Sequence, residues 1–251
     1  VMSWPWPGSS LSSSIGAEGC SYREGGRTML WCEDWGELDI GAQALSVTRA
    51  CVSLHQFAEA LGNAIDAKDR HTYDHSQHVA VIGYMIALKI GFTAQQADVI
   101  HIAGHLHDIG KIGVPDYILS KKERLTEEEW QYIKRHPETG AAIIGAVSCF
   151  KEKGGIKDMV LHHHERYDGG GYPAGLRGNE IPIGARILSV ADTFSAMIQD
   201  RPYRKAMSPE KAFDEIALLS GSQLDPICTA ALLAIKDKVI GWIRGFTLTD
   251  H

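Results

Sequence analysis

Apolar residues recur at helical spacing along most of this chain. From Ala42 onward they follow the period of an α-helix, and the alternation typical of half-buried strands is nearly absent. The pattern predicts helices over residues 43–66, 72–90, 94–106, 126–146, 155–164, 184–199, 208–219 and 226–240. We therefore expect an all-α domain in which each helix buries one apolar face against its neighbours.

Several helix starts carry N-terminal signals. Residues 93–96 (TAQQ) and 126–129 (TEEE) have the spacing of a capping box, in which two side chains bond free backbone N–H groups. Residues 208–209 (SP) and 225–226 (DP) place a cap residue before a proline at the first helical position. These signals predict where four of the helices begin.

Residues 1–40 differ from the rest of the chain. They are rich in Ser, Gly and Trp and show no clear period. We interpret them as a loosely ordered arm or as the remnant of an upstream region. Residues 4–8 (WPWPG) and the serines that follow lack the basic segment and the apolar core of a signal peptide. The predicted helical domain therefore spans residues 41–251.

Composition narrows the class of protein. The 251 residues are 44% hydrophobic, which is enough for a buried core, and they carry a formal net charge of −6. This charge argues against binding of DNA or RNA by bulk electrostatics. Five widely spaced cysteines without a C-x-x-C pair indicate a reducing cytoplasm rather than a disulfide framework. No run of about 18 apolar residues occurs, so no membrane span is expected.

Histidine and aspartate residues recur at an even spacing through the predicted helices. The spacings between His75, His107, His136, His163 and Asp192 are 32, 29, 27 and 29 residues, about one helix and its connection each. In a helical bundle this rhythm lets successive elements contribute one inward metal ligand apiece. A single histidine is more often an ordinary core or surface residue, but the rhythm of the whole set favours a metal centre.

Two of these positions are doubled by a neighbouring candidate ligand, Asp108 and His164. A carboxylate beside an imidazole can bridge two metals while the imidazole binds one of them. Imidazole and carboxylate groups with no cysteine nearby favour Fe or Mn over a structural zinc site. Two metals about 3.5–4 Å apart can hold a bridging hydroxide and neutralise charge on a phosphoryl group. The sequence therefore predicts a centre that hydrolyses a phosphate ester.

These residues lie in motifs that resemble those of a known family. The motifs occupy residues 107–116 (HDIGKIGVPD), 136–137 (HP), 163–173 (HHERYDGGGYP), 181–192, 200–205 (DRPYRK) and 221–226. They are similar to the motifs of the HD-GYP subgroup of the HD phosphohydrolases, and the resemblance covers about residues 43–235. It implies a helical bundle of the HD-domain type with a C-terminal helical extension, and a catalytic domain over residues 41–251.

The resemblance also implies an activity. Members of the subgroup are bacterial enzymes that hydrolyse the second messenger cyclic di-GMP at an Fe or Mn centre. We expect this chain to be a cytoplasmic phosphodiesterase that opens cyclic di-GMP by attack of a metal-bridging hydroxide, with pGpG or GMP as the final product. The metal ligands that the resemblance implies are His75, His107, Asp108, His136, His163, His164 and Asp192.

Several cations near the motifs suit a phosphate-containing substrate. Lys111 lies one helical turn after His107 and is expected to place its ammonium against a phosphate oxygen, acting with Asp108 in catalysis. A surface lysine is the alternative. Arg201 and Arg204 are three residues apart, so they could clamp the phosphates in bidentate fashion or form a charge cluster at a helix end.

The glycine-rich segment at residues 168–173 is expected to lie beside the metals, as it does in the subgroup. Tyr172 could stack on a guanine or bond a phosphate, or it could belong to a purely structural turn, because glycines and proline also favour a rigid bend. Three carboxylates are expected to orient the ligands without binding metal themselves, namely Asp69, Glu165 and Asp168.

Among the remaining histidines, one is a candidate metal ligand and three are interpreted as structural or surface residues. His71 precedes His75 by four residues, which is one face of a helix if the helix includes residue 71. Some members of the subgroup have a glutamate at this position and use it for a third metal, so His71 is a candidate ligand, with a first-turn polar residue as the alternative. The expected cofactors are therefore two or three metal ions. His55, His101 and His105 are interpreted as structural or surface residues.

Two other functions stay open from the sequence. One is hydrolysis of another nucleotide, such as cyclic GMP-AMP, and the other is a non-catalytic module that binds the cyclic dinucleotide or a partner protein. The segment at residues 168–173 favours a cyclic dinucleotide without deciding its bases, and the filled ligand positions favour catalysis. A sensor protein or a diguanylate cyclase is the expected kind of partner, and the oligomeric state stays open.

Overall fold

The computed structural model describes residues 21–24, 27–30, 54–69, 74–200 and 204–249. The chain divides into two compact units, Val1–Ser53 and Leu54–His251. In the first unit, strands β1 (Ser21–Glu24) and β2 (Arg27–Leu30) form an antiparallel hairpin. The hydrophobic pattern predicted no strand in this part of the chain.

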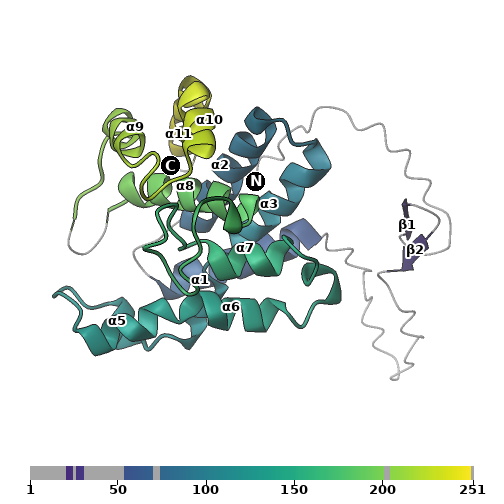
Figure 1. The fold of residues 1–251 in the computed structure, drawn as a ribbon, viewed down its shortest axis with the longest axis horizontal. Helices are drawn as coiled ribbons and strands as arrows, with labels where there is room; N and C mark the ends of the chain where they lie inside the picture. Colours follow the sequence, from purple (N-terminus) through teal and green to yellow (C-terminus); the bar gives the residue numbers. More distant parts are fainter. Residues whose placement is uncertain (1–20, 25–26, 31–53, 70–73, 201–203, 250–251) are drawn as a thin grey trace, which may run out of the picture. The chain divides into compact units, whose positions relative to one another are not determined.

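The second unit is built from helices (Figure 1). The α-helices of its described residues are α1 (Leu54–Lys68), α2 (His75–Ile90), α3 (Ala94–Leu106), α4 (Asp116–Leu119), α5 (Glu127–Lys134), α6 (His136–Ile144), α7 (Ile156–His162), α8 (Ile183–Met197), α9 (Pro209–Leu218), α10 (Pro226–Ala234) and α11 (Lys236–Thr249). Short 3-10 helices occupy η1 (Ile109–Gly113), η2 (Ser148–Phe150) and η3 (Gly178–Glu180). The predicted all-α class is confirmed. Within the described residues, no helix combines the length and apolar character that crossing a bilayer requires.

Most of the predicted helices are confirmed with small shifts at their ends. The prediction for α3 is correct at both ends, and α7, α8 and α9 lie where the pattern placed them. Residues 43–53 and 72–73 of the first two predictions lie outside the described residues. Two predictions were wrong because each joined two helices: residues 126–146 form α5 and α6, and residues 226–240 belong to α10 and α11.

Proline explains the first of these breaks. Pro137 has no N–H group, and in a continuous helix its ring would clash with the carbonyl of Ile133. The helix therefore ends at Lys134 and a new one begins at His136, with the proline in its first turn. The second break falls at Ile235, where φ is −112° and ψ is 15°. No adjacent proline or glycine accounts for it.

The four predicted helix starts are confirmed. Thr93 and Thr126 both form reciprocal capping boxes with the residue three positions later. Ser208 and Asp225 accept backbone hydrogen bonds at the starts of α9 and α10, and each of these helices has a proline in its first turn. Each such cap contributes about 1 kcal/mol to the stability of its helix.

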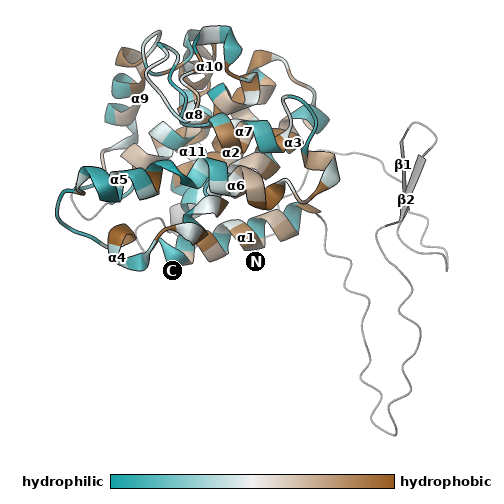
Figure 2. Ribbon diagram, turned by 60° about the horizontal axis from the view of Figure 1, so that its bottom comes forward, coloured by the Kyte–Doolittle hydropathy of each residue, from teal (hydrophilic) through white to brown (hydrophobic). Residues whose placement is uncertain are grey.

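The core of this unit forms where α2 packs against α3 and α8. Burial of side chains such as Val79, Ile82 and Ile86 supplies the hydrophobic free energy, roughly 1.5–3 kcal/mol for each large apolar side chain. Helices α2 and α3 approach closely because Gly104 has no side chain, and an added Cβ there would lie 2.5 Å from Ala80 Cα. By contrast, α5 is largely hydrophilic and has no buried residue (Figure 2).

A second close approach joins η1 to α6. A Cβ on Gly110 would overlap the carbonyl oxygen of His136 and would lie 2.5 Å from the backbone nitrogen of Gly140. The backbone of η1 can therefore lie against α6 only with glycine at position 110. This contact brings Asp108 and Lys111 beside His136.

We expect Gly110→Ala to lower the free energy of unfolding by about 1–3 kcal/mol, because the added methyl group must push α6 away. Gly241→Ala in α11 is the matched control, since no atom lies within 4 Å of its added Cβ. This control should stabilise the protein by about 0.5–1 kcal/mol, as alanine generally does in a helix. Urea denaturation followed by circular dichroism measures both effects, and equal stability of the two variants would contradict the packing described here.

Candidate metal centre

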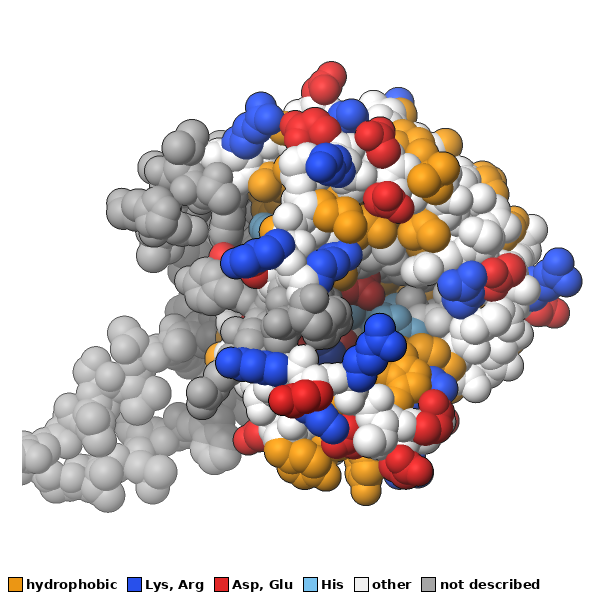
Figure 3. All heavy atoms as spheres, turned by 90° about the vertical axis from the view of Figure 1, so that its left-hand side faces the viewer, with side chains coloured by type: hydrophobic (Ala, Val, Ile, Leu, Met, Phe, Trp, Pro, Cys, Tyr) orange, Lys and Arg blue, Asp and Glu red, His pale blue; other side chains and the backbone are white. Residues whose placement is uncertain are grey.

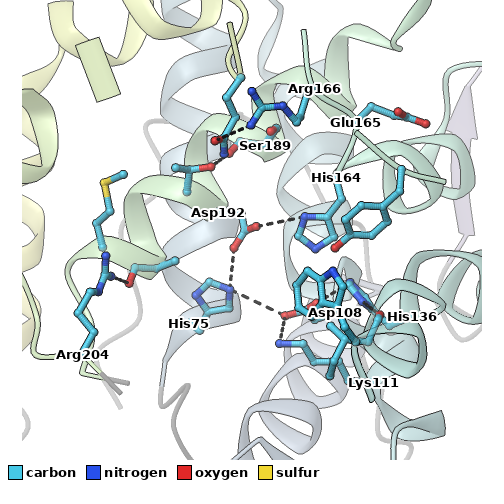
Figure 4. Close-up of a pocket in the computed structure, with 17 residues that line it drawn as sticks. His75, Asp108, Lys111, His136, His164, Glu165, Arg166, Ser189, Asp192 and Arg204 are labelled. Atoms are coloured by element: carbon cyan, nitrogen blue, oxygen red, sulfur yellow. Dashed lines mark hydrogen bonds and ion pairs between the residues drawn. The ribbon is translucent and has the colours of Figure 1, made fainter. Parts of the chain in front are cut away.

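Five separate elements bring the seven predicted ligands together, and Figure 4 shows the five of them that line the pocket. In chain order they are α2 with His75, the end of α3 with His107 and Asp108, the start of α6 with His136, the end of α7 with His163 and His164, and α8 with Asp192. Most of these side chains are buried. We call the set the His/Asp centre. Each step of the even sequence spacing thus leads to the next element that contributes a ligand.

Three of the histidines are held in the same way. His107, His136 and His163 each follow the last turn of a helix, and each donates its Nδ1–H to the carbonyl three residues earlier, at 2.6, 2.7 and 2.7 Å. The last turn of a helix leaves such carbonyls free. Because a carbonyl can only accept, the bond places the proton on Nδ1 and leaves the lone pair on Nε2.

Asp108 lies between two groups of histidines. Its Oδ1 is 3.2 Å from His136 Nε2, while its Oδ2 is 3.3 Å from His107 Nε2 and 3.9 Å from His75 Nε2. The donor atoms that lie within 4.8 Å of one another form two sets, Asp108 with His136, His163 and His164, and Asp108 with His75 and His107. The two sets therefore share one carboxylate.

Helix α8 completes the centre beside His75. Asp192 Oδ1 lies 3.1 Å from His75 Nε2, and Asp192 Oδ2 lies 4.0 Å from His164 Nδ1. One turn later on α8, the hydroxyl of Ser195 lies 2.9 Å from His75 Nδ1. The two ring nitrogens of His75 are thus held from the same helix. Our sequence analysis missed Ser195, although its position three residues after Asp192 places it on the same helix face.

Electrostatics favour ionised carboxylates at Asp108 and Asp192 and neutral imidazoles at His163 and His164. Burial alone would raise the pKa of Asp108, but Lys111 and the neighbouring imidazoles hold it well below its ordinary value. Burial is likewise outweighed at Asp192, whose pKa is lowered by a hydrogen-bonded imidazole. Burial lowers the pKa of His164 to about 3 and takes the pKa of His163 well below its ordinary value. These protonation states are the ones that bind metal ions.

The donor atoms fit transition-metal ions. The Nε2 of His107 is buried without a hydrogen-bond partner, which is costly unless a ligand occupies the site. Burial opposes protonation of His107, yet Asp108 raises its pKa to about 9, so the centre stabilises a positive charge at this point. A metal ion would take the place of that proton. Nitrogen and oxygen donors without sulfur suit ions such as Fe, Mn or Zn.

Lys111 lies beside the shared carboxylate. Its Nζ is 2.8 Å from Asp108 Oδ2 and 2.8 Å from Asp69 Oδ2. Burial would lower the pKa of Lys111, but the two carboxylates outweigh it and raise the pKa. The ammonium therefore stays charged and fixed in place. Asp69 contacts the His/Asp centre through this lysine.

The glycine-rich loop at residues 168–176 is anchored to the chain beside the centre. Glu165 accepts hydrogen bonds from the backbone N–H groups of Ala174 and Leu176, at 2.7 and 3.1 Å. A Cβ on Gly171 would meet the backbone of Glu165, so only glycine allows this close passage. The anchored loop places the Tyr172 ring with its centroid 5.0 Å from that of His164.

Asp168 and Glu165 both contact the glycine-rich loop. Asp168 receives two hydrogen bonds from Arg166, at 2.6 and 3.0 Å, and one from the Gly170 N–H. Glu165 holds the loop backbone and lies 3.6 Å from His162, which is outside the predicted ligand set. These hydrogen bonds of Asp168 and Glu165 stabilise the loop, and a role of the two carboxylates in orienting the ligands stays a prediction.

A pocket of about 360 Å³ opens onto the His/Asp centre. Its walls include Lys111, Arg166, Tyr172 and Arg204. In a space-filling view, histidine side chains are visible in a hollow that Lys and Arg side chains border (Figure 3). Three carboxylates, Asp108, Glu165 and Asp192, also line the pocket and balance its three cations, so an anionic ligand would depend on metal ions at the His/Asp centre.

Trp130 is a pocket residue that the sequence analysis missed. It lines the pocket from α5, although no residue of that helix is buried and the Trp130 side chain is itself 38% exposed. Trp130 and Tyr132 are both exposed aromatic residues on this mainly hydrophilic helix, so the sequence alone marks two candidates and does not choose between them. Trp130 gives the pocket an aromatic surface in addition to its charges.

Two predicted site residues, His71 and Arg201, lie outside the described residues. Arg204 is described and donates a hydrogen bond from Nη2 to the carbonyl of Ala196 at 2.6 Å. Its guanidinium is thus oriented along the wall of the pocket. Lys205 pairs with Asp200 at 3.3 Å on the surface.

Together, the fold and the site define an all-α protein with a buried His/Asp centre that can hold transition-metal ions. Residues 59–227 match the HD domain family. The chain belongs to this family, as its motifs indicated.

Known relatives agree with this assignment. The chain is 38% identical over 174 residues to the cyclic di-GMP phosphodiesterase response regulator RpfG of Xanthomonas campestris pv. campestris, covering 69% of this chain and 46% of that protein. It is 39% identical over 173 residues to the 3'3'-cGAMP-specific phosphodiesterase 3 of Vibrio cholerae, covering 69% and 37%. The chain thus spans less than half the length of these relatives.

A solved structure shows the same fold. The HDG"Y"P protein Bd1817 from Bdellovibrio bacteriovorus superimposes with a TM-score of 0.56 at 18% identity, over 74% of this chain and 65% of that one. At this low identity the likeness concerns the arrangement of the helices alone.

Proposed function

We propose that this chain is a metal-dependent phosphodiesterase that hydrolyses cyclic di-GMP to linear pGpG, with GMP as the product of a second hydrolysis. The observation that carries the proposal is the position of Asp108, whose two oxygens lie between two sets of histidines in a pocket. Similarity to cyclic di-GMP phosphodiesterases supports the choice of substrate.

The proposed cofactors are two ions, with Fe or Mn preferred because the ligands are imidazole and carboxylate. One ion would be held by the set of Asp108, His136, His163 and His164, and the other by the set of Asp108, His75 and His107, with Asp192 beside both. When bound, such ions lower the pKa of water and neutralise phosphoryl charge. A third ion would use His71.

Two residues of the pocket contribute to the chemistry through their protonation states. The raised pKa of Lys111 keeps it cationic, so it stabilises negative charge on a phosphate and does not act as a proton donor. Burial and nearby carboxylates also raise the pKa of Tyr172, so its phenol stays neutral and can donate a hydrogen bond to a phosphate oxygen. Arg204 and Arg166 add positive charge along the wall for the second phosphate.

The relative from Vibrio cholerae makes 3'3'-cGAMP a second candidate substrate, because its identity to this chain is as high as that of the cyclic di-GMP enzymes. The two nucleotides share their ring of two phosphates and differ in one base. The proposed metal ions and the cationic side chains act on the phosphates, so they would bind the two nucleotides equally well. Discrimination must come from groups that hydrogen-bond the base edges, because stacking on an aromatic residue such as Trp130 holds guanine and adenine alike.

The proposal also covers the bounds of the catalytic domain, its cellular location and its partner protein. We infer that residues 41–251 form the catalytic domain, which the compact unit Leu54–His251 and the family match at residues 59–227 support. A cytoplasmic location follows from the reducing environment that the cysteine pattern indicates. A sensor protein or a diguanylate cyclase is the proposed partner, since such a partner would couple hydrolysis to a signal.

Anaerobic turnover with Fe(II) or Mn(II) tests the proposed activity. We expect the unchanged protein to convert cyclic di-GMP to pGpG, and Asp108→Asn to lose roughly 100-fold or more of this activity because both ions lose a shared ligand. Asp214→Asn, which changes an exposed aspartate of α9, is the matched control and should keep full activity. The products are separated by chromatography.

The same assay separates the alternatives. Turnover of 3'3'-cGAMP with little turnover of cyclic di-GMP would move the assignment to the second substrate. Bound metal without hydrolysis of either nucleotide by the unchanged protein would contradict the catalytic proposal and favour a binding module.

Replacement of Trp130 tests base stacking. We expect Trp130→Ala to raise KM for the preferred nucleotide by about 10-fold, because loss of one base–aromatic stack costs roughly 1–3 kcal/mol. Tyr132→Ala is the matched control, since Tyr132 is an exposed aromatic residue of the same helix that is not part of the pocket wall. Steady-state kinetics measure both, and equal KM values for the two variants would exclude the stacking role.

A further inference from the structure

A second group of histidines lies outside the His/Asp centre. His55 is in the first turn of α1, and His101 and His105 lie in the second half of α3. One donor atom from each of the three residues lies within 4.8 Å of the others. The ring centroids are 4.4 Å apart for His55 and His101, 4.8 Å for His101 and His105, and 5.7 Å for His55 and His105. We call this group the α1–α3 histidine cluster.

The cluster points away from the His/Asp centre. His105 and His107 are two residues apart, so their side chains point about 200° apart around the helix axis. His101 and His105 are four residues apart and share the face of α3 that packs against α1. Helix α1 approaches this face closely, because a Cβ on Gly62 would lie 2.8 Å from the His105 carbonyl oxygen. An ion held by the cluster would therefore occupy a site separate from the His/Asp centre.

The distances within the cluster suit one ion. His101 Nε2 lies 3.0 Å from His105 Nε2, and two nitrogens bound to one tetrahedral ion at about 2.0–2.1 Å would be about 3.3 Å apart. His101 and His105 are 6% and 1% exposed, which shields such an ion from bulk water. His55 is half-buried, so the ion could enter from its side.

Polar atoms without hydrogen bonds lie on the same helix. Nδ1 of His105 and Oδ1 of Asp98 are buried and have no hydrogen-bond partner. Asp98 precedes His101 by three residues on the same face of α3, and its carboxyl interacts electrostatically with His55. Buried polar atoms without partners are costly. An ion bound at His105 Nε2 cannot partner Nδ1, which lies across the ring, so it would offset only the cost at Asp98, whose carboxyl interacts electrostatically with His55.

A hydrogen bond between the two α3 histidines is the simpler alternative. One neutral ring would donate to the other, which needs only His101 and His105. It does not involve His55, whose ring centroid lies 4.4 Å from that of His101. Burial lowers the pKa of His101 to about 2, so this ring is neutral at physiological pH and has a lone pair for a metal.

We propose that His55, His101 and His105 bind one divalent transition-metal ion of the zinc type, with water as the fourth ligand. Three imidazoles and a water molecule, with no sulfur, suit Zn²⁺. The ion joins the start of α1 to the helix whose end carries the ligand His107. Its role is to stabilise this junction, and it does not depend on the activity proposed above.

Metal stoichiometry tests the proposal. The full chain, freed of metal, is titrated with Co²⁺, whose visible absorption reports its coordination, and bound metal is counted after gel filtration. We expect His55→Gln and His101→Gln to bind one equivalent less than the unchanged chain while keeping its turnover. Asp108→Asn is the reciprocal control, which should lose metal from the His/Asp centre and keep the equivalent bound by the cluster.

Thermal unfolding provides an independent readout. Zn²⁺ should raise the Tm of Asp108→Asn, and this rise should disappear when His55→Gln is added to that variant. Because His55 is half-buried in the first turn of α1, its replacement keeps the test valid if His101→Gln does not fold. Equal stoichiometry in the unchanged chain and His55→Gln, or no Zn²⁺-dependent rise in Asp108→Asn, would overturn the proposal. Neither readout requires hydrolysis, so this outcome leaves the proposed function untouched.

Discussion

The candidate site depends on one carboxylate that two sets of imidazoles share. Asp108 can serve both sets only as an anion, in a buried position where burial alone would favour the protonated acid. The ammonium of Lys111, 2.8 Å away, offsets this penalty. Removing the carboxylate would leave that ammonium and several imidazoles facing one another in a buried space without sufficient compensating charge. The packing at Gly110, which brings this pair of side chains beside α6, is therefore as important as the ligands themselves.

Helix ends give the histidines their fixed orientation. Each of three ligand rings is held by a carbonyl that the end of a helix leaves free, so no additional side chain is needed to set the tautomer. The break between α5 and α6 shows how this arises from the sequence. Pro137 cannot bond the carbonyl of Ile133, and His136 takes that carbonyl instead, at 2.7 Å. The same residue pair thus ends one helix and positions one ligand.

The sequence was sufficient to predict the features that depend on local patterns. Helical periodicity and the caps at Thr93 and Thr126 placed most helices, and the spacing of His and Asp residues identified a set that the fold does bring together. A bridging role for Asp108 was predicted, but which histidines lie on each side of it could not be, because this depends on contacts between α3, α6 and α2 that no local pattern encodes. Ser195 was missed although its spacing from Asp192 on α8 is a local signal, whereas no local pattern separates Trp130 from Tyr132 on α5.

Two further differences show where periodicity fails. The end of α10 at Ala234 has no local breaker, so an uninterrupted apolar pattern predicted one helix where the chain forms two. His101 and His105 were interpreted from the sequence as structural or surface residues. Only the packing of α1 against α3 brings His55 to them and makes the three rings a candidate site.

A crystal structure of the full chain grown anaerobically with Mn²⁺ tests the central claim most directly, with anomalous scattering used to locate the ions. The account predicts two ions about 3.5–4 Å apart, with one Asp108 oxygen bound to each. A single ion, or two ions that do not share Asp108, would contradict it.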